Sequence, residues 1–337
     1  MTLRRIVLLN DTDFQGQHFG CQRVMRTIRD NLKNRNAQIL DTVPVGMPWH
    51  LMSDKMEKIK NSEMVVINGE GTLHHGKRKG KWLLEAAQFA RESGAKVALI
   101  NALWQDNPED WAEIAGRIDH IWCRDSRSAR DLSKATGRDI PWLGDLSLCS
   151  GAEAIQRERS NVISVGDSVH GTVTKKLAEL SLELDETSIS PLMTNFKYIS
   201  PDLKGIRKRL RIIIGELLQG RFERRFGIID FATDEWDYLN KLSHSQMLIT
   251  GRFHAVCMAV TTATPFVGIK SNSWKIEMLL EDIGLSKGRL LCLDGLDAES
   301  LQQKDWNYSK EETVNIAARL KDWKLKSAAM FDEIAGV

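Results

Sequence analysis

The chain has 337 residues, which is long enough for two domains with separate hydrophobic cores. Its hydrophobic content of 42% and charged content of 27% are ordinary for a soluble globular protein, and they argue against a disordered or fibrous chain. The net charge of +2 argues against bulk binding of nucleic acid.

No run of the sequence approaches the roughly 20 apolar residues needed to span a bilayer. The N-terminal apolar run, residues 6–9, is too short for the core of a signal peptide. The five cysteines are scattered without a Cys-x-x-Cys pair, which indicates neither a zinc site nor a disulfide framework. We therefore expect a cytoplasmic protein, either free or at the inner face of the cell membrane.

Strand and helix candidates alternate along the whole chain. In the first half the predicted strands are 5–10, 38–42, 64–68, 96–101, 118–123 and a short one near Trp142, with helices at 20–34, 52–60, 81–93 and 126–136. In the second half the predicted strands are 161–165, 188–192, 227–231, 247–250, 265–269 and 289–293, with helices at 173–184 and 310–334. Such βα alternation predicts an α/β fold with doubly wound parallel sheets.

The predicted organisation is two Rossmann-like domains facing a cleft, which is a GT-B-like arrangement. We place the N-terminal domain at residues 1–150 and a polar linker at 151–160. The C-terminal domain is placed at 161–310, and the last helix, 311–337, is expected to pack back on the first domain.

The most informative motif is Gly251-Arg252-Phe253-His254, between the apolar run 247–250 and an apolar helix start. A strand-to-helix turn offers free N–H groups and the positive end of a helix dipole to an anion. An arginine fork suits phosphate or carboxylate, and a histidine can transfer a proton near neutral pH. The alternative interpretation is a salt-bridged arginine followed by a hydrogen-bonded histidine.

A second polar cluster follows the proline-entered strand 265–269. It contains Lys270, Asn272 and Lys275. Because ligands bind at the carboxyl ends of the strands in such sheets, we expect this cluster and the Arg252 turn to share one site.

These motifs resemble those of the polysaccharide pyruvyl transferase family. The resemblance includes the Arg252 turn, the strand that leads to Lys275, the glycine loop Gly69-Glu70-Gly71-Thr72 and the Arg124-Asp125 pair after a strand. Three features depart from the usual pattern. Phe253 stands where leucine is usual, Glu70 stands where glycine is commoner, and the first loop lacks the common Gly-Asn-x-Gly-Asp form.

The resemblance implies transfer of a pyruvyl group from phosphoenolpyruvate to a sugar of a cell-surface polysaccharide or its lipid-linked precursor. A cyclic ketal forms, phosphate is released, and neither a cofactor nor a metal is required. His254 is then the general acid, with Arg252 beside it. The residues assigned to the donor are Arg124, Arg252, Phe253, Asn272 and Lys275.

The acceptor is assigned to the first domain. His18 is placed as the base that deprotonates the sugar hydroxyl, with a polar loop at a helix start as the alternative. The residues assigned to the acceptor cleft are Asp11, His18, Gly69, Glu70, Gly71, Thr72, His74 and Asp145. The alternative for the glycine loop is a tight βα turn.

Two other functions fit the same pattern. A GT-B glycosyltransferase would use Arg252 and Lys275 for a nucleotide-sugar diphosphate and Glu277 or Glu281 for the ribose. A non-catalytic binding protein would keep the fold with a degenerate site.

Residues 203–226 stand apart, because they combine eight lysines and arginines with eight leucines and isoleucines in one predicted helix. A basic amphipathic helix is typical of a peripheral membrane contact or of a grip on a lipid-diphosphate acceptor. The alternative is a solvated helix that packs its apolar side on the domain.

Overall fold

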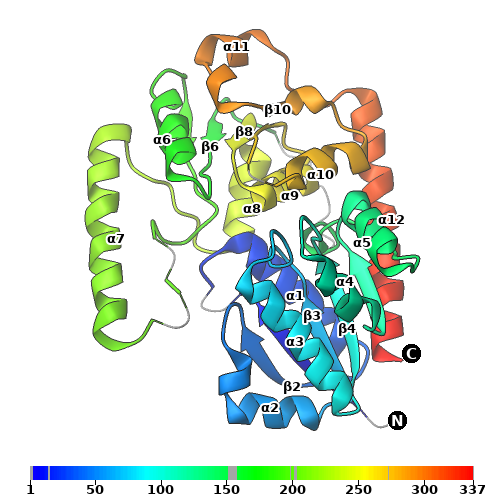
Figure 1. The fold of residues 1–337 in the computed structure, drawn as a ribbon. Helices are drawn as coiled ribbons and strands as arrows, with labels where there is room; N and C mark the ends of the chain where they lie inside the picture. Colours follow the sequence, from blue (N-terminus) through cyan, green and yellow to red (C-terminus); the bar gives the residue numbers. More distant parts are fainter. Residues whose placement is uncertain are drawn as a thin grey trace. The chain divides into compact units, whose positions relative to one another are not determined.

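The computed structural model divides into two compact units, each built on one β-sheet with helices around it (Figure 1). The structure describes residues 3–13, 16–150, 158–197, 199–200, 203–271 and 273–336. In that part of the chain the first unit comprises 3–13, 24–149 and 322–336, and the remaining residues form the second unit. The prediction of two Rossmann-like domains is confirmed.

The units differ from the predicted domain boundaries in two places. Residues 16–23, which the predicted N-terminal domain includes, belong to the second unit. Residues from Asp322 onward belong to the first unit. Residues 151–157, most of the predicted linker, lie outside the described residues.

The sheet of the first unit has five parallel strands in the order β2-β1-β3-β4-β5. Its central strand β3 is buried at every position, as expected for a parallel sheet covered on both faces. The strands are β1 (Arg4–Asp11), β2 (Ala37–Pro44), β3 (Met64–Asn68), β4 (Lys96–Ala102) and β5 (His120–Cys123). The helices are α1 (Phe19–Lys33), η1 (Trp49–Leu51), α2 (Ser53–Lys60), α3 (Arg78–Glu92), α4 (Glu109–Gly116), α5 (Ser126–Thr136) and η2 (Leu146–Leu148).

The second sheet also has five parallel strands, in the order β10-β9-β8-β6-β7. Its strands are β6 (Ile163–Val165), β7 (Thr187–Ile189), β8 (Met247–Thr250), β9 (Phe266–Ile269) and β10 (Leu290–Leu291). The helices are α6 (Gly171–Leu180), α7 (Gly205–Phe226), α8 (Glu235–His244), α9 (Phe253–Thr261), α10 (Lys275–Ile283), η3 (Lys287–Arg289), η4 (Leu293–Gly295), α11 (Ala298–Gln303) and α12 (Lys310–Ala335). Helix α9, which follows β8, is buried along almost its whole length.

The last part of α12 completes the core of the first unit. Trp323 is fully buried there, and its ring lies so close to Gly144 that a Cβ at that glycine would come within 2.3 Å of it. Arg35 donates to the Asp332 carboxylate at 2.6 Å and to the carbonyl of Ala328 at 3.0 Å. The predicted C-terminal helix is therefore present, and its end contributes to the core of the first unit.

Two predicted strands are wrong, because each makes only a single bridge. Trp142 pairs only with Cys123, and the preceding Pro141 has no N–H with which to extend the ladder. In 227–231 only Ile229 forms a bridge, and its partner Ile189 is the last residue of β7.

Candidate functional site

The turn between β8 and α9 lies where the sequence predicts it. Gly251 lets the loop after β6 approach this turn, since a Cβ there would lie 2.7 Å from the side chain of Ser168. Arg252 is the N-cap residue of α9, and His254 lies in the first turn of that helix, 8% exposed. The arginine and the histidine therefore lie at a helix N-terminus, at the carboxyl end of the sheet.

Arg252 is held by an ion pair with Asp167 of the loop after β6. Its Nε donates to Asp167 Oδ2 at 2.8 Å, and Nη2 donates to the same oxygen. Asp167 Oδ1 accepts from the backbone N–H of Leu192 at 3.1 Å. Within the described part of the chain Nη1 of Arg252 has no hydrogen-bond partner. The carboxylate therefore orients the guanidinium and leaves one of its edges for a ligand.

Sequence reasoning missed Asp167. The residue lies two positions after the predicted strand 161–165, at the carboxyl end that carries the other site residues. Its position after that strand is the feature of the sequence from which Asp167 could have been predicted as a site residue. Its partner, Arg252, lies 85 residues further along the chain, so the pair itself could not be read from local sequence.

His18 and His254 meet in the second unit. Their ring centroids are 5.4 Å apart with the rings edge to face. Gly20 makes this approach possible, because a Cβ there would lie 2.2 Å from Cβ of His254. The structure thus places His18 beside the predicted donor residues rather than with the rest of the predicted acceptor residues.

The surroundings of His18 are cationic. Burial, followed by the charges of His254 and Arg252, lowers the pKa of His18 well below its usual range, and Lys275 lowers it further. The imidazole of His18 is therefore neutral at pH 7. A field that disfavours a proton on His18 favours a bound anion at the same place.

Lys275 is the first residue of α10, whereas Arg252 and His254 lie at the N-terminus of α9. Each of these two N-termini is the positive end of a helix dipole. The ring of Phe253 lies 5.4 Å from that of His254. Asn272, which the sequence assigns to the donor, lies outside the described residues.

A pocket of about 470 Å³ opens beside these residues in the second unit. Its polar side includes His18, Asp167 and Arg252, at the carboxyl ends of the strands. Another part of the lining, which we call the apolar wall, consists of apolar side chains. Its aromatic residues are Phe196, Phe222 and Phe231.

His18, Cys21 and His254 also have ligand atoms within 4.8 Å of one another, a set that a metal ion could use. The charges of Arg252 and Lys275 oppose a divalent cation at this place. The same electrostatics favour an anion, so we assign the cluster to anion binding.

The carboxyl edge of the first sheet carries a different kind of cluster. Asn10 Nδ2 donates to the carbonyl of Asn68 at 2.7 Å and to Thr72 Oγ1 at 3.0 Å. The carboxylate of Glu70 accepts from Thr12 Oγ1 at 2.8 Å and from Asn68 Nδ2 at 3.2 Å. This cluster is neutral or acidic, and its members hold one another in place.

Backbone strain marks the same edge. Asn10 has φ +62° and Asn101 has φ +54°, values that residues other than glycine rarely adopt. Such residues concentrate at functional sites, where the surrounding structure holds them in place.

The glycine loop follows β3 as predicted, and the local structure explains why glycine stands at both Gly69 and Gly71. A Cβ at Gly69 would lie 2.7 Å from Cα of Ala102, and Gly71 has φ +58°. His74, 6% exposed, has its Nε2 3.2 Å from Nζ of Lys77. The tight-turn interpretation therefore accounts for both glycines, while Glu70, Thr72 and His74 remain candidates for the acceptor.

Three other predicted residues are engaged in ion pairs of the first unit. Asp11 accepts from Arg29 at 2.6 Å. Arg124 and Asp145 pair at 3.4 Å with side chains only 2% and 0% exposed, and Asp145 also caps η2. This burial gives Arg124 and Asp145 a structural role. Their roles in ligand binding stay predictions.

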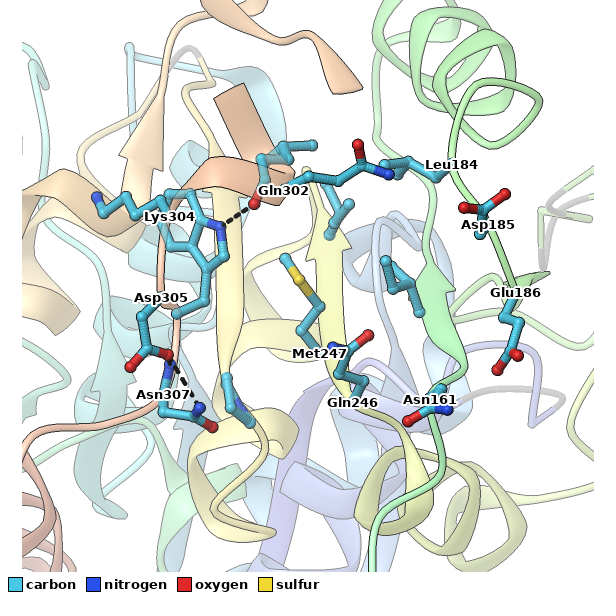
Figure 2. A pocket seen from close by; sticks show the side chains of 15 residues that line it. Asn161, Leu184, Asp185, Glu186, Gln246, Met247, Gln302, Lys304, Asp305 and Asn307 are labelled. Atoms are coloured by element: carbon cyan, nitrogen blue, oxygen red, sulfur yellow. Dashed lines mark hydrogen bonds between the residues drawn. The ribbon is translucent and has the colours of Figure 1, made fainter. Parts of the chain in front are cut away.

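A second pocket, of about 360 Å³, lies at the amino ends of the strands of the second sheet (Figure 2). Asn161 and Gln246 precede β6 and β8, while Asp185 and Glu186 line the side of the pocket near β7. Ligands of doubly wound sheets bind at the other edge, so we place the functional site at the carboxyl ends.

Comparison with known proteins identifies a family. The family model described as polysaccharide pyruvyl transferase matches residues 24–273. None of the curated proteins matches the sequence.

Two solved structures show the fold. A UDP-GlcNAc 2-epimerase from Methanocaldococcus jannaschii is 11% identical with a TM-score of 0.51, covering 95% of this chain and 100% of its own. S. aureus MnaA, solved with UDP, is 10% identical with a TM-score of 0.50, covering 99% of this chain and 92% of its own. At these identities the likeness concerns the fold alone.

Proposed function

Because the chain belongs to the polysaccharide pyruvyl transferase family, we propose that it transfers the pyruvyl group of phosphoenolpyruvate to a sugar of a cell-surface polysaccharide or of its lipid-linked precursor. The product is a cyclic ketal, and phosphate is released. The observation that carries this proposal is the carboxyl edge of the second sheet, where Arg252 and Lys275 lie at helix N-termini and where burial, followed by the charges of His254 and Arg252, lowers the pKa of His18.

The donor has a carboxylate and a phosphate, and the site offers a partner for each. Nη1 of Arg252, which has no hydrogen-bond partner among the described residues, is suited to a charge-assisted contact with one anionic group. Lys275 and the N-termini of α9 and α10 are suited to the other. Asp167 holds the arginine in place before the donor arrives, which lowers the entropic cost of binding.

In this reaction two hydroxyl oxygens of the sugar form bonds to the same carbon of the donor. His254 protonates the methylene carbon, which leaves positive charge on the carbon that bears the phosphate. The first hydroxyl attacks this carbon and loses its proton to a base. Phosphate then leaves with the electrons of its C–O bond, and the second hydroxyl closes the ring with loss of its own proton.

His18 is suited to be the base in this scheme. With its pKa lowered in the free protein, it is neutral and has a lone pair available. The anionic donor offsets the charges of His254 and Arg252, so its binding raises the pKa of His18 towards the range in which a base works well. Donor binding thus prepares the site for proton transfer from the acceptor.

The apolar wall of the pocket suits the acceptor. Rings such as those of Phe196 and Phe222, whose centroids are 5.3 Å apart, present flat faces to a pyranose or to an apolar chain. The polar cluster around Asn10, Glu70 and Thr72 in the first unit is the proposed partner for further acceptor hydroxyls.

A titration with phosphoenolpyruvate tests the donor. We expect phosphoenolpyruvate to raise the melting temperature of the chain, whereas a panel of UDP- and GDP-sugars leaves it unchanged. In Arg252→Lys the positive charge beside Asp167 is kept and the fork is lost, so donor affinity should fall by about 10- to 100-fold. Arg252→Ala should bind still more weakly.

The melting temperature without ligand separates binding from folding, because Arg252→Ala also leaves Asp167 without its cationic partner. Unchanged donor affinity in Arg252→Lys would remove the arginine fork from the site. Stabilisation by a nucleotide sugar in place of phosphoenolpyruvate would instead assign the chain to the glycosyltransferase alternative.

A further inference from the structure

Helix α7 (Gly205–Phe226) exposes an apolar stripe along three of its turns. The stripe, which we call the α7 stripe, consists of Ile206, Leu210, Ile213, Ile214 and Leu217. These positions recur at the spacing of one helix face. Their exposed fractions run from 48% to 74%, whereas the buried residues of the helix are Gly215 and Phe226.

The helix is attached to the second unit through its other side. The ring of Phe222 lies 5.3 Å from that of Phe196, in the segment before the helix, and the two rings are tilted against each other. Glu223 accepts from the backbone N–H of Ile229 at 3.4 Å. In Figure 1, α7 lies beside α6, to which Arg225 is linked by an ion pair with Glu179. The α7 stripe is therefore on the face that the rest of the unit leaves uncovered.

Basic residues border the stripe on both sides and at its end. Arg207 and Arg211 each follow a stripe residue by one position, and Arg209 lies one turn before Ile213. Arg221 and Arg224 continue the row of Leu217 towards the C-terminus of the helix. All five arginines are exposed.

The charge of the helix is strongly one-sided. The segment has seven arginines and lysines against two glutamates, an excess larger than the net charge of +2 of the whole chain. The positive charge of the molecule is thus concentrated around the apolar stripe.

We propose that α7 is an interfacial helix that docks the chain on a surface of anionic lipid. The apolar side chains enter the acyl boundary, and the arginines, whose stems are apolar, reach the headgroups from either side. None of the described helices has the length and the apolar character needed to cross a membrane. A nucleic acid would match the arginines but would leave five aliphatic side chains facing phosphates, so lipid is the better partner.

Helix α7 also contributes to the pocket of the candidate site. Phe222, on the side of α7 that packs on the unit, lines the same pocket as His18 and Arg252. A chain docked through the other side of α7 would hold the pocket about one helix diameter, roughly 10 Å, behind the lipid surface, where a lipid-linked acceptor is confined. This last step rests on the proposed function, whereas the docking does not.

The test is co-sedimentation of the full chain with vesicles of phosphatidylcholine, alone or with one-third phosphatidylglycerol. We expect binding to the anionic vesicles that weakens as salt is raised. Replacing Arg207, Arg211 and Arg224 with glutamate should lower the partition coefficient by at least about 100-fold, since the loss of each basic residue alone costs about fivefold and each added glutamate is repelled by the anionic surface. The stripe variant Ile206→Ser, Leu210→Ser, Leu217→Ser should lose binding even at low salt.

Helix α12 supplies matched controls. Arg319→Glu, Lys321→Glu and Lys324→Glu reverse three exposed cations there, and Val314→Ser with Leu325→Ser removes two exposed apolar side chains. Both control variants should bind vesicles as the parent does, and all variants should keep the response to phosphoenolpyruvate.

Several results would overturn the proposal. The proposal fails if the parent does not bind anionic vesicles. It also fails if the α12 control variants lose as much vesicle binding as the α7 variants, or if the stripe variant binds vesicles as the parent does. A stripe that instead mediates self-association would appear as a dimer in sedimentation velocity that the stripe variant dissolves, with no vesicle binding. Loss of the phosphoenolpyruvate response with vesicle binding intact would count against the proposed function and leave the docking in place.

Discussion

The two sheets share one topology, but the side chains at their carboxyl edges differ in chemical character. At the carboxyl edge of the first sheet, two asparagines, two threonines and Glu70 form hydrogen bonds with one another at 2.7–3.2 Å. At the same edge of the second sheet, Arg252 is held by Asp167 beside two histidines, in a field that keeps His18 neutral. The first edge suits the hydroxyls of a sugar and the second suits an anion, so under the proposed function the two edges differ in the groups that they bind.

The largest expected effect is that of His254→Ala at the second edge. Removing the general acid should lower turnover by about 100- to 10,000-fold while donor affinity stays within a fewfold of the parent value, because the proton is transferred only in the transition state. Turnover of acceptor and the melting shift with phosphoenolpyruvate measure the two quantities.

The matched control for this variant is His244→Ala. That histidine lies at the end of α8, and its Nδ1 is 2.8 Å from the carbonyl of Asn240. Its loss should leave turnover unchanged. If His254→Ala kept its turnover, the histidine would be excluded from the chemistry and the contrast between the two edges would reduce to anion binding alone.

A smaller effect is expected at the first edge, from Glu70→Gln. The amide keeps the size of the side chain but weakens the charge-assisted bonds from Thr12 and Asn68. We expect KM for the acceptor to rise about tenfold and donor affinity to stay unchanged. Glu63→Gln, at the amino end of β3, is the control, because that carboxylate bonds only to Arg5 among the described residues. Weakened donor binding in Glu70→Gln would break the proposed division between the units.

Local sequence was sufficient to predict the strand–turn–helix elements of the site. The apolar run before Gly251, the Arg252 and His254 pair and the strand that leads to Lys275 are all within 30 residues, and the structure has them as β8, α9, β9 and the start of α10. Each depends on periodicity and on turn chemistry, which act over short distances along the chain.

The remaining features depend on contacts between distant segments. Nothing near His18 indicates that residues 16–23 belong to the second unit, because that depends on Gly20 fitting against His254, 234 positions further on. The spacing of the α7 stripe is visible in the sequence, but the direction in which it faces is set by the packing of Phe222 on Phe196. A pattern predicts a face of a helix, and only the tertiary contacts determine what covers it.

The smallest expected effect concerns the charge state of His18. Its folded-state pKa lies below the usual value of 6.5, so below pH 6.5 the unfolded chain binds a proton that the folded chain does not. This contribution to stability is therefore complete above pH 6.5 and is lost as the pH falls towards the folded-state pKa. Between pH 7.5 and 6.0 the parent should lose about 0.8 kcal/mol more of its free energy of unfolding than His18→Gln does.

Denaturant melts of both proteins at the two pH values measure this difference, with His170→Gln, an exposed histidine at the start of α6, as the control. Saturating phosphoenolpyruvate should reduce this difference between the parent and His18→Gln, because an anion beside His18 raises its affinity for a proton. For the same reason, donor binding near pH 6 should be accompanied by uptake of a proton. A parent and a His18→Gln variant with the same pH dependence would mean that burial and the neighbouring positive charges together do not exclude that proton from the edge of the second sheet. The electrostatic contrast between the two sheet edges would then have to be abandoned.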